Sequence, residues 1–265
     1  MLNDFLISTG IAWAFAIVMM LVVWWISVRI HNWGLIDIAW SAGFVPIVIF
    51  YAAYNHGWAP RRWLIAGMVT LWSARLGAHV YFRVMGQHPK EDVRYVQLRK
   101  DWSRNLNTKM FWFFQLQAAL LPFLAVPFLI SCLNDQPGIR VIEWVGSGLW
   151  LVALIGETVA DSQLKHFRAY PKNHGEVCEV GLWRYSRHPN YFFEWLMWMA
   201  FFLFALGSPL GCATIYCPAL MLYFLLRVTG IPMTEAQSVK SKGEKYIRYQ
   251  KTTSAFLPWF RKDAR

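Results

Sequence analysis

The sequence is poor in charged residues and in cysteine. Only 15% of its 265 residues are charged, against about 25% in soluble domains, and 57% are hydrophobic. The four cysteines have no metal-ligand spacing, and the chain contains neither a Walker-type loop nor a Gly-x-Gly-x-x-Gly turn. These absences argue against a soluble domain and predict no metal site. Any nucleotide must be held in an unconventional way.

Apolar runs near twenty residues and sixteen tryptophans are typical of a membrane protein. The run at 5–28 lacks a preceding basic stretch and a cleavage pattern, so we interpret it as a retained span rather than a secretory signal. We expect a single all-α integral membrane domain over residues 1–265, with about seven transmembrane helices. They are predicted at 5–28, 34–54, 63–82, 110–132, 142–161, 189–207 and 210–229.

Lysine and arginine divide unevenly between the two sides of these spans. Twenty-two of the 26 lie on the side that carries the 83–109 loop, the 162–188 loop and the C-terminus. Because cytoplasmic loops are enriched in basic residues, we expect an outside N-terminus and a cytoplasmic C-terminus in a bacterial inner membrane. This distribution explains the net charge of +11 without a nucleic-acid partner.

The chain is organised around residues 181–194, where a basic loop enters an apolar helix. Arg184, Arg187 and His188 crowd before Pro189, which suits the first helical position. A helix start flanked by arginines favours an anion, although a positively charged membrane flank is the alternative interpretation. Glu194 favours a functional interpretation, since a carboxylate within a span is costly.

A polar stripe is predicted at the cytoplasmic end of the fifth span. Glu157, Asp161 and Arg168 fall within about 40° of one another around a helix. An amphipathic exit helix is the alternative, but it does not explain Glu157, which lies among apolar neighbours.

Asp37 and Arg75 are ionisable residues within the second and third spans. Asp37 either snorkels at the membrane edge or needs a partner. Arg75, His79 and Arg83 recur every four residues and form one stripe. Arg75 either pairs with Asp37 or binds phosphate or substrate.

The last span is predicted to break at Gly230 and Pro232. Glu235 follows, and then a basic amphipathic tail at 240–251 that is either a membrane-surface helix or a lid. Carboxylates and arginines thus converge at the cytoplasmic ends of three spans. We infer a cavity open to the cytoplasm for a large charged cofactor, with a floor formed by Asp37, Trp72, Arg75 and Trp198.

The segment Gly181-Leu-Trp-Arg-Tyr-Ser-Arg-His-Pro-Asn-Tyr191, with Asp161, Arg227 and Phe256-Leu-Pro258, resembles the steroid 5-alpha-reductase superfamily. The resemblance covers nearly the whole chain and is strongest to the bacterial branch, whose members are mostly of unknown function. It implies a seven-helix bundle that holds NADPH at its cytoplasmic side. Membrane sterol reductases and isoprenylcysteine or phospholipid methyltransferases carry similar Arg-His-Pro-x-Tyr segments.

The resemblance and the residue pattern together assign a cofactor site. Asp161 corresponds to a ribose or amide contact, and Arg168 and Arg227 to phosphate contacts. The full expected set is Arg75, Glu157, Asp161, Arg168, Arg184, Tyr185, Arg187, His188, Asn190, Tyr191, Glu194, Trp198, Arg227 and Glu235. We expect the cofactor in the half at about 142–265, and the scaffold and substrate-cavity helices at about 1–132.

The catalytic candidates are Asp37, Trp72 and Arg75. In the steroid enzymes, the position of Trp72 holds a tyrosine that protonates or orients the ketone. The positions of Glu157 and Ile231 hold an asparagine and a histidine in those enzymes. Asp37, Arg75 or His79 would supply the proton. These substitutions are more compatible with NADPH binding than with specificity for a steroid substrate.

Three functional hypotheses follow. The first is an NADPH-dependent membrane reductase of a steroid-like or isoprenoid enone, acting as a monomer on a lipophilic small molecule among membrane lipids. The second is an S-adenosylmethionine-dependent membrane methyltransferase, whose usual paired glutamates after the last span are reduced here to Glu235. The third is a non-catalytic, lipid-binding scaffold.

Overall fold

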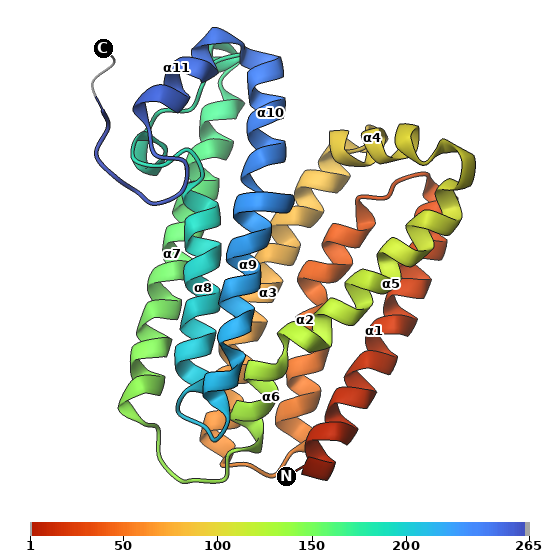
Figure 1. Cartoon of the computed structure of the whole chain (residues 1–265), viewed down its shortest axis with the longest axis vertical. Helices are drawn as coiled ribbons and strands as arrows, with labels where there is room; N and C mark the ends of the chain where they lie inside the picture. The colour runs from red at the N-terminus through yellow and green to blue at the C-terminus, as the bar shows by residue number, and fades with distance from the viewer. Residues whose placement is uncertain (1, 263–265) are drawn as a thin grey trace. The chain divides into compact units, whose positions relative to one another are not determined.

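Helices form every regular element of the described chain, residues 2–262, in the computed structural model (Figure 1). A parallel bridge between Ser186 and Ser254 is the one strand-like contact in that range. The all-α class expected from the sequence is therefore confirmed. The chain divides into two compact units, Met1–Ile139 with Gly207–Gly211, and Arg140–Leu206 with Cys212–Arg265.

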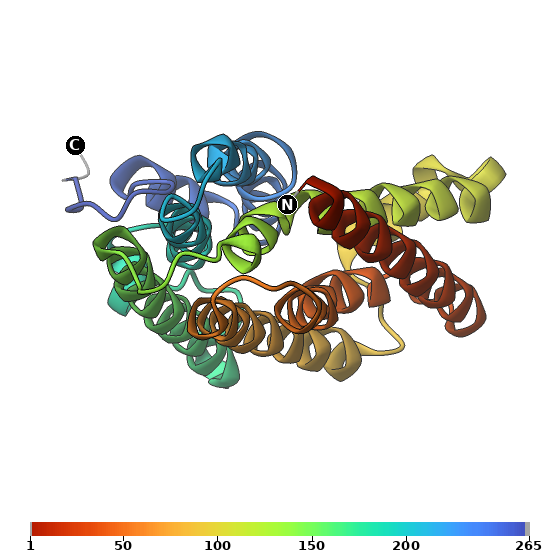
Figure 2. The same ribbon diagram turned by 90° about the horizontal axis from the view of Figure 1, so that it is seen from below.

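The first unit contains helices α1 to α6. They are α1 (Leu2–Ile30), α2 (Leu35–Tyr54), α3 (Ala59–Gln87), α4 (Val93–Asp101), η1 (Ser103–Asn105), α5 (Leu106–Leu124) and α6 (Val126–Leu133). α2 packs along α3, and α1 packs along α5 (Figure 2). The fully buried ring of Phe44 lies 5.4 Å from Trp72 and 6.2 Å from Phe128, so α2, α3 and α6 share one aromatic core.

The second unit contains helices α7 to α11 and four short helices. They are α7 (Val141–Ala169), η2 (Pro171–Asn173), η3 (Gly181–Arg184), α8 (Pro189–Ala205), η4 (Gly211–Ile215), α9 (Tyr216–Tyr223), η5 (Phe224–Val228), α10 (Ile231–Lys242) and α11 (Glu244–Thr252). α7 packs along α8, and α9 packs against α8. Pro189 takes the first position of α8, as the sequence predicts.

Five helical segments are long and apolar enough to cross a membrane. They are Leu2–Ile30, Leu35–Tyr54, Ser103–Leu133, Val141–Ala169 and Gly211–Lys242. The protein is therefore a multi-pass membrane protein. Two further predicted spans fall on α3, which carries four arginines, and on α8, which has 17 residues.

The structure refines three predicted segments. The span at 110–132 is interrupted at Ala125, between α5 and α6, where Pro122 and Pro127 each remove a backbone donor. The 83–109 loop is partly helical, because α4 forms within it. The last span ends in η5, a π-helical turn, and the predicted break falls between η5 and α10.

Gly146 permits a close approach of α7 and α8. A Cβ atom at this position would lie 2.7 Å from the backbone nitrogen of Phe204 and 2.9 Å from the carbonyl oxygen of Ala200. Both are backbone atoms, so the two helices would have to move apart to admit even a methyl group. Glycine is thus required here for packing.

We therefore expect Gly146→Ala to lower the free energy of unfolding by about 1–3 kcal/mol through overpacking. Gly148→Ala, two residues along α7, is the matched control, because a Cβ there meets nothing within 4 Å. It should be neutral or stabilise the protein by up to about 1 kcal/mol. Thermal unfolding in detergent measures both variants, and equal effects would contradict the packing argument.

Candidate functional site

The loop before α8 is docked on α7 by hydrogen bonds. The donor–acceptor pairs are Leu182 N to Gln163 Oε1 (2.9 Å), Trp183 Nε1 to the Ala160 carbonyl (2.9 Å), and Asn190 Nδ2 to Asp161 Oδ1 (3.3 Å). Gly181 makes the approach possible, since its φ is +56° and a Cβ would overlap the Gln163 side chain. The stretch at 181–194 and the polar stripe of α7, predicted separately, thus meet around Asp161.

Two carboxylates of the predicted cofactor set are buried in helices of the second unit. Glu157 is 4% exposed on α7, and Glu194 is 9% exposed on α8. Trp198, which is fully buried, donates its indole N–H to Glu194 Oε1 at 3.0 Å. Glu194 therefore orients the indole ring one turn further along α8.

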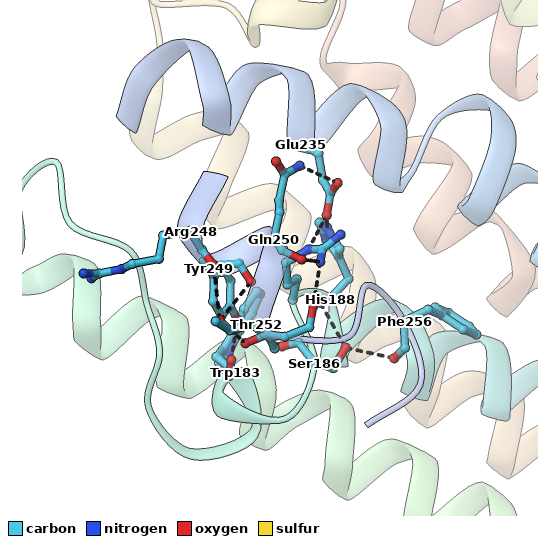
Figure 3. A network of polar contacts seen from close by, with 11 residues as sticks. Trp183, Ser186, His188, Glu235, Arg248, Tyr249, Gln250, Thr252 and Phe256 are labelled. Carbon is cyan, nitrogen blue, oxygen red and sulfur yellow. Dashed lines mark hydrogen bonds and ion pairs between the residues drawn. The ribbon is translucent and has the colours of Figure 1, made fainter. Parts of the chain in front are cut away.

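Four residues form a tightly bonded group, the Glu235 network: Arg187, His188, Glu235 and Gln250. Arg187 Nε donates to Glu235 Oε1 at 2.6 Å, and His188 Nε2 lies 3.3 Å from the same oxygen (Figure 3). Gln250 Nε2 donates to Glu235 Oε2 at 2.8 Å. Arg187 Nη1 also donates to the backbone carbonyls of Gln250 (2.8 Å) and Thr253 (2.6 Å).

The Glu235 network joins the entry of α8 to α10 and α11. Its polar groups are largely engaged with one another, so Arg187, His188 and Glu235 have a structural role that the sequence did not indicate. Sequence reasoning assigned them to a cofactor because each lies near a helix end. Arg187 and Glu235 are 48 residues apart, so no local sequence pattern predicts that they pair.

The surroundings of His188 favour its neutral form. Burial lowers the pKa of its imidazole, and the positive charge of Arg187 adds to this effect, which together outweigh the opposing influence of Glu235. The tautomer that carries its proton on Nε2 donates a hydrogen bond to the carboxylate of Glu235. The ring also stacks on Tyr191, with centroids 5.3 Å apart, and the Tyr191 hydroxyl lies 3.1 Å from Thr234 Oγ1.

The other predicted cofactor residues of the second unit lie at its surface: Arg168, Arg184, Tyr185 and Arg227. Arg168, near the end of α7, is close enough to the ammonium group of Lys242 for their like charges to repel. Two neighbouring cations at helix C-terminal ends attract an anion. Arg227 lies in the π-helical turn η5, a structure that is frequent at functional sites.

In the first unit, Asp37 is engaged by residues of α3 and α4. Arg94 Nη2 is 2.6 Å and Arg83 Nη2 is 3.5 Å from Asp37 Oδ2, while the Tyr95 hydroxyl donates to Oδ1 at 2.8 Å. The structure pairs Asp37 with Arg94 and Arg83 rather than with Arg75, because α4 folds back onto the start of α2.

Tyr95 and Arg94 are polar residues that sequence reasoning missed. Burial and the negative charge of Asp37 raise the pKa of Tyr95 well above its usual value, so the phenol keeps its proton. Two features of the sequence pointed to such partners: Asp37 within an apolar run, which requires a partner, and the basic loop that follows α3. The partner was 57 residues away, too far for a local pattern to identify it.

Trp72 and Arg75 lie one turn apart on α3. Trp72 is fully buried and packs on Phe44, and Arg75 is half-buried. Trp72 thus contributes to the aromatic core of the first unit. Within residues 2–262, no three His, Cys, Asp or Glu side chains are arranged to hold a metal ion.

The fold defines a multi-pass, all-α membrane protein. A family model described as "Protein of unknown function (DUF1295)" matches residues 23–253, and the chain belongs to that family. An uncharacterized protein of Schizosaccharomyces pombe is 28% identical over 209 residues, which cover 69% of this chain and 60% of the yeast protein. The chain thus spans about 60% of the length of that relative. No solved structure matches this chain.

The Glu235 network makes a direct prediction about stability. Arg187→Ala should lower the free energy of unfolding by roughly 3 kcal/mol, because it leaves the largely buried carboxylate of Glu235 without its strongest partner. Arg184→Ala removes the same side chain three residues earlier, at an exposed position, and should change the stability by less than about 0.5 kcal/mol. Thermal unfolding in detergent distinguishes the two, and similar melting temperatures would refute the structural role of Arg187.

Proposed function

We propose that this protein is an NADPH-dependent membrane reductase whose second unit holds the cofactor. Asn190 carries the proposal. Its Nδ2 group is bonded to Asp161, while its Oδ1 atom is buried and accepts no hydrogen bond within residues 2–262. An unsatisfied buried acceptor costs about 1–3 kcal/mol. A ligand that donates an amide or hydroxyl hydrogen to Oδ1 would recover this cost.

The groups around Asn190 suit a dinucleotide. Asp161 offers carboxylate oxygens to ribose hydroxyls, and Glu157 lies one turn away on the same face of α7. Arg168 and Lys242 place two positive charges at one end of the unit, where they would bind phosphate groups. Arg227 adds a third guanidinium group in η5.

The resemblance to the steroid 5-alpha-reductase superfamily supports the same assignment. NADPH would supply a hydride to the β-carbon of an activated C=C bond in a lipophilic, steroid-like or isoprenoid enone. The carbonyl oxygen of such a substrate gains negative charge and must be stabilised by a donor. The residues of this chain must therefore supply that donor and exclude water.

We propose that Tyr95 is that donor: its one hydroxyl hydrogen, which it donates to Asp37 Oδ1 in this structure, would turn to the carbonyl oxygen of the substrate. The indole of Trp72 has no proton that it can give up readily, and its ring is committed to packing. Asp37 is ion-paired and accepts hydrogen bonds, so it is better suited to orient a phenol than to donate a proton itself. Arg75 and His79 remain the alternative donors.

We further propose seven membrane spans, with α3 and α8 added to the five apolar segments. The distribution of basic residues supports an outside N-terminus and a cytoplasmic C-terminus in a bacterial inner membrane. The cofactor residues near the loop at 181–188 would then face the cytoplasm, where NADPH is available. The substrate would enter from the bilayer, and the protein would act as a monomer.

Binding of NADPH to the detergent-purified protein is the first test. A ligand at a hundred times its Kd stabilises a folded protein by about 2.7 kcal/mol, which should raise the melting temperature by roughly 5 °C or more. Arg168→Ala should weaken binding by about tenfold or more through loss of a charge-assisted bond. Lys165→Ala, an exposed cation three residues earlier on α7, should not.

Parallel titrations separate the alternatives. A shift with S-adenosylmethionine and none with NADPH would replace the reductase with the methyltransferase. No shift with NADPH, NADH or S-adenosylmethionine, in protein shown to carry no co-purified nucleotide, would favour the scaffold.

Tyr95→Phe tests the donor, because it removes a single hydroxyl group. We expect turnover of a lipophilic enone, followed by NADPH consumption, to fall at least about a hundredfold while the NADPH-induced shift is retained. Tyr81→Phe, at an exposed position on α3, is the control. Full activity of Tyr95→Phe would contradict this proposal and leave Arg75 or His79 as the proton donor.

A further inference from the structure

The C-terminal segment closes on itself beside the entry of α8. Residues 252–262, the C-terminal loop, begin and end together, because the Lys262 backbone N–H donates to the Thr252 carbonyl at 2.9 Å. The loop is also tied to the stretch before α8. Trp259 N–H donates to the Tyr185 carbonyl at 2.9 Å, and Arg187 N–H donates to the Ser254 carbonyl at 2.8 Å. The loop is therefore an ordered part of the second unit.

A cavity of about 430 Å³ lies within the C-terminal loop. Its polar lining includes three consecutive hydroxyl residues and two ammonium groups, those of Thr252, Thr253, Ser254, Lys251 and Lys262. Its apolar lining is formed by Leu257, Trp259 and Phe260. Cationic and hydroxyl residues together with aromatic rings in one lining match a ligand that has both an anionic group and an apolar part.

Two lysines give the cavity its positive charge. Neither Lys251 nor Lys262 forms an ion pair within residues 2–262. Glu179 is paired with Arg261 at 2.5 Å, and Glu235 is engaged in its network. The two lysines are thus available to an external anion.

The apolar wall is exposed to an unusual degree. Leu257, Trp259 and Phe260 are 56%, 68% and 77% exposed, and the Phe260 ring packs edge-to-face on that of Tyr185. Tryptophan and tyrosine beside lysine are typical of the membrane–water interface. Tyr185 lies four residues before the first residue of α8. The loop therefore lies at the depth where α8 would enter the bilayer.

We propose that the cavity of the C-terminal loop binds the headgroup of an anionic phospholipid. Lys251, Lys262 and the Ser254 hydroxyl would receive the phosphate, and Trp259 and Phe260 would contact the glycerol and the start of the acyl chains. None of the predicted cofactor residues lines this cavity, so the proposal is independent of the reductase.

The full-length protein in neutral detergent is titrated with phosphatidylglycerol and with phosphatidylcholine, and bound lipids are counted by native mass spectrometry. We expect one saturable phosphatidylglycerol site that phosphatidylcholine does not fill. Lys251→Gln with Lys262→Gln should weaken it about thirtyfold, since each lysine near a lipid surface contributes a roughly fivefold effect. Lys165→Gln with Lys240→Gln, an equal loss of exposed charge elsewhere in the unit, should leave it unchanged.

Trp259→Ala is a second variant that keeps both charges. It should weaken phosphatidylglycerol binding while the melting temperature of the lipid-free protein stays close to that of the wild type, since the ring is mostly exposed. Equal binding of phosphatidylcholine, or unchanged binding in the double lysine variant, would overturn the proposal. Inorganic phosphate or glycerol 3-phosphate that binds as tightly as the lipid would also overturn it, because the source of the anion would then be soluble.

Discussion

The second unit depends on the carboxylate of Glu235. It receives Arg187 and His188 from the entry of α8 and Gln250 from α11, while it belongs itself to α10. A carboxylate that is partly removed from water is stabilised when its partners are well placed, so the three segments are held to one arrangement. The same arrangement sets the start of α8, and through it the contact of Asn190 with Asp161. The C-terminal loop, bonded to Ser186 and Arg187, follows from it as well.

In the first unit too, a carboxylate holds several segments together by binding side chains from each of them. Asp37 binds α4 to the start of α2 and the end of α3, through Arg94, Tyr95 and Arg83. Arg61 is fully buried, and its guanidinium group donates to the carbonyls of Gln136 (2.6 Å) and Gly138 (2.5 Å). In an apolar chain each ionisable group must find a partner. The few charges therefore determine how the loops close over the helix ends.

The sequence predicts the helices well because apolar runs and proline are local signals. Five of the seven predicted runs each fall on a single helix. The run at 110–132 is divided at Ala125, between Pro122 and Pro127, and the run at 210–229 covers η4, α9 and η5. Side-chain pairing is a different matter. Arg94 lies 57 residues from Asp37, and Arg187 lies 48 residues from Glu235, so no periodicity connects them. Arg187, predicted to be part of an anion site, is paired with Glu235 of the same chain.

These pairings narrow the set of candidate cofactor residues, because they separate polar groups that are bonded within the protein from those that are not. The basic stretch before α8 looked like a single anion site, yet Arg187 is largely occupied and Arg184 is exposed. Asn190 differs from both: one half of its amide is bonded to Asp161 and the other half is buried without a partner within residues 2–262. Because this acceptor lies beside Asp161 in the predicted cofactor site, the cofactor hypothesis rests more on Asn190 than on the arginines.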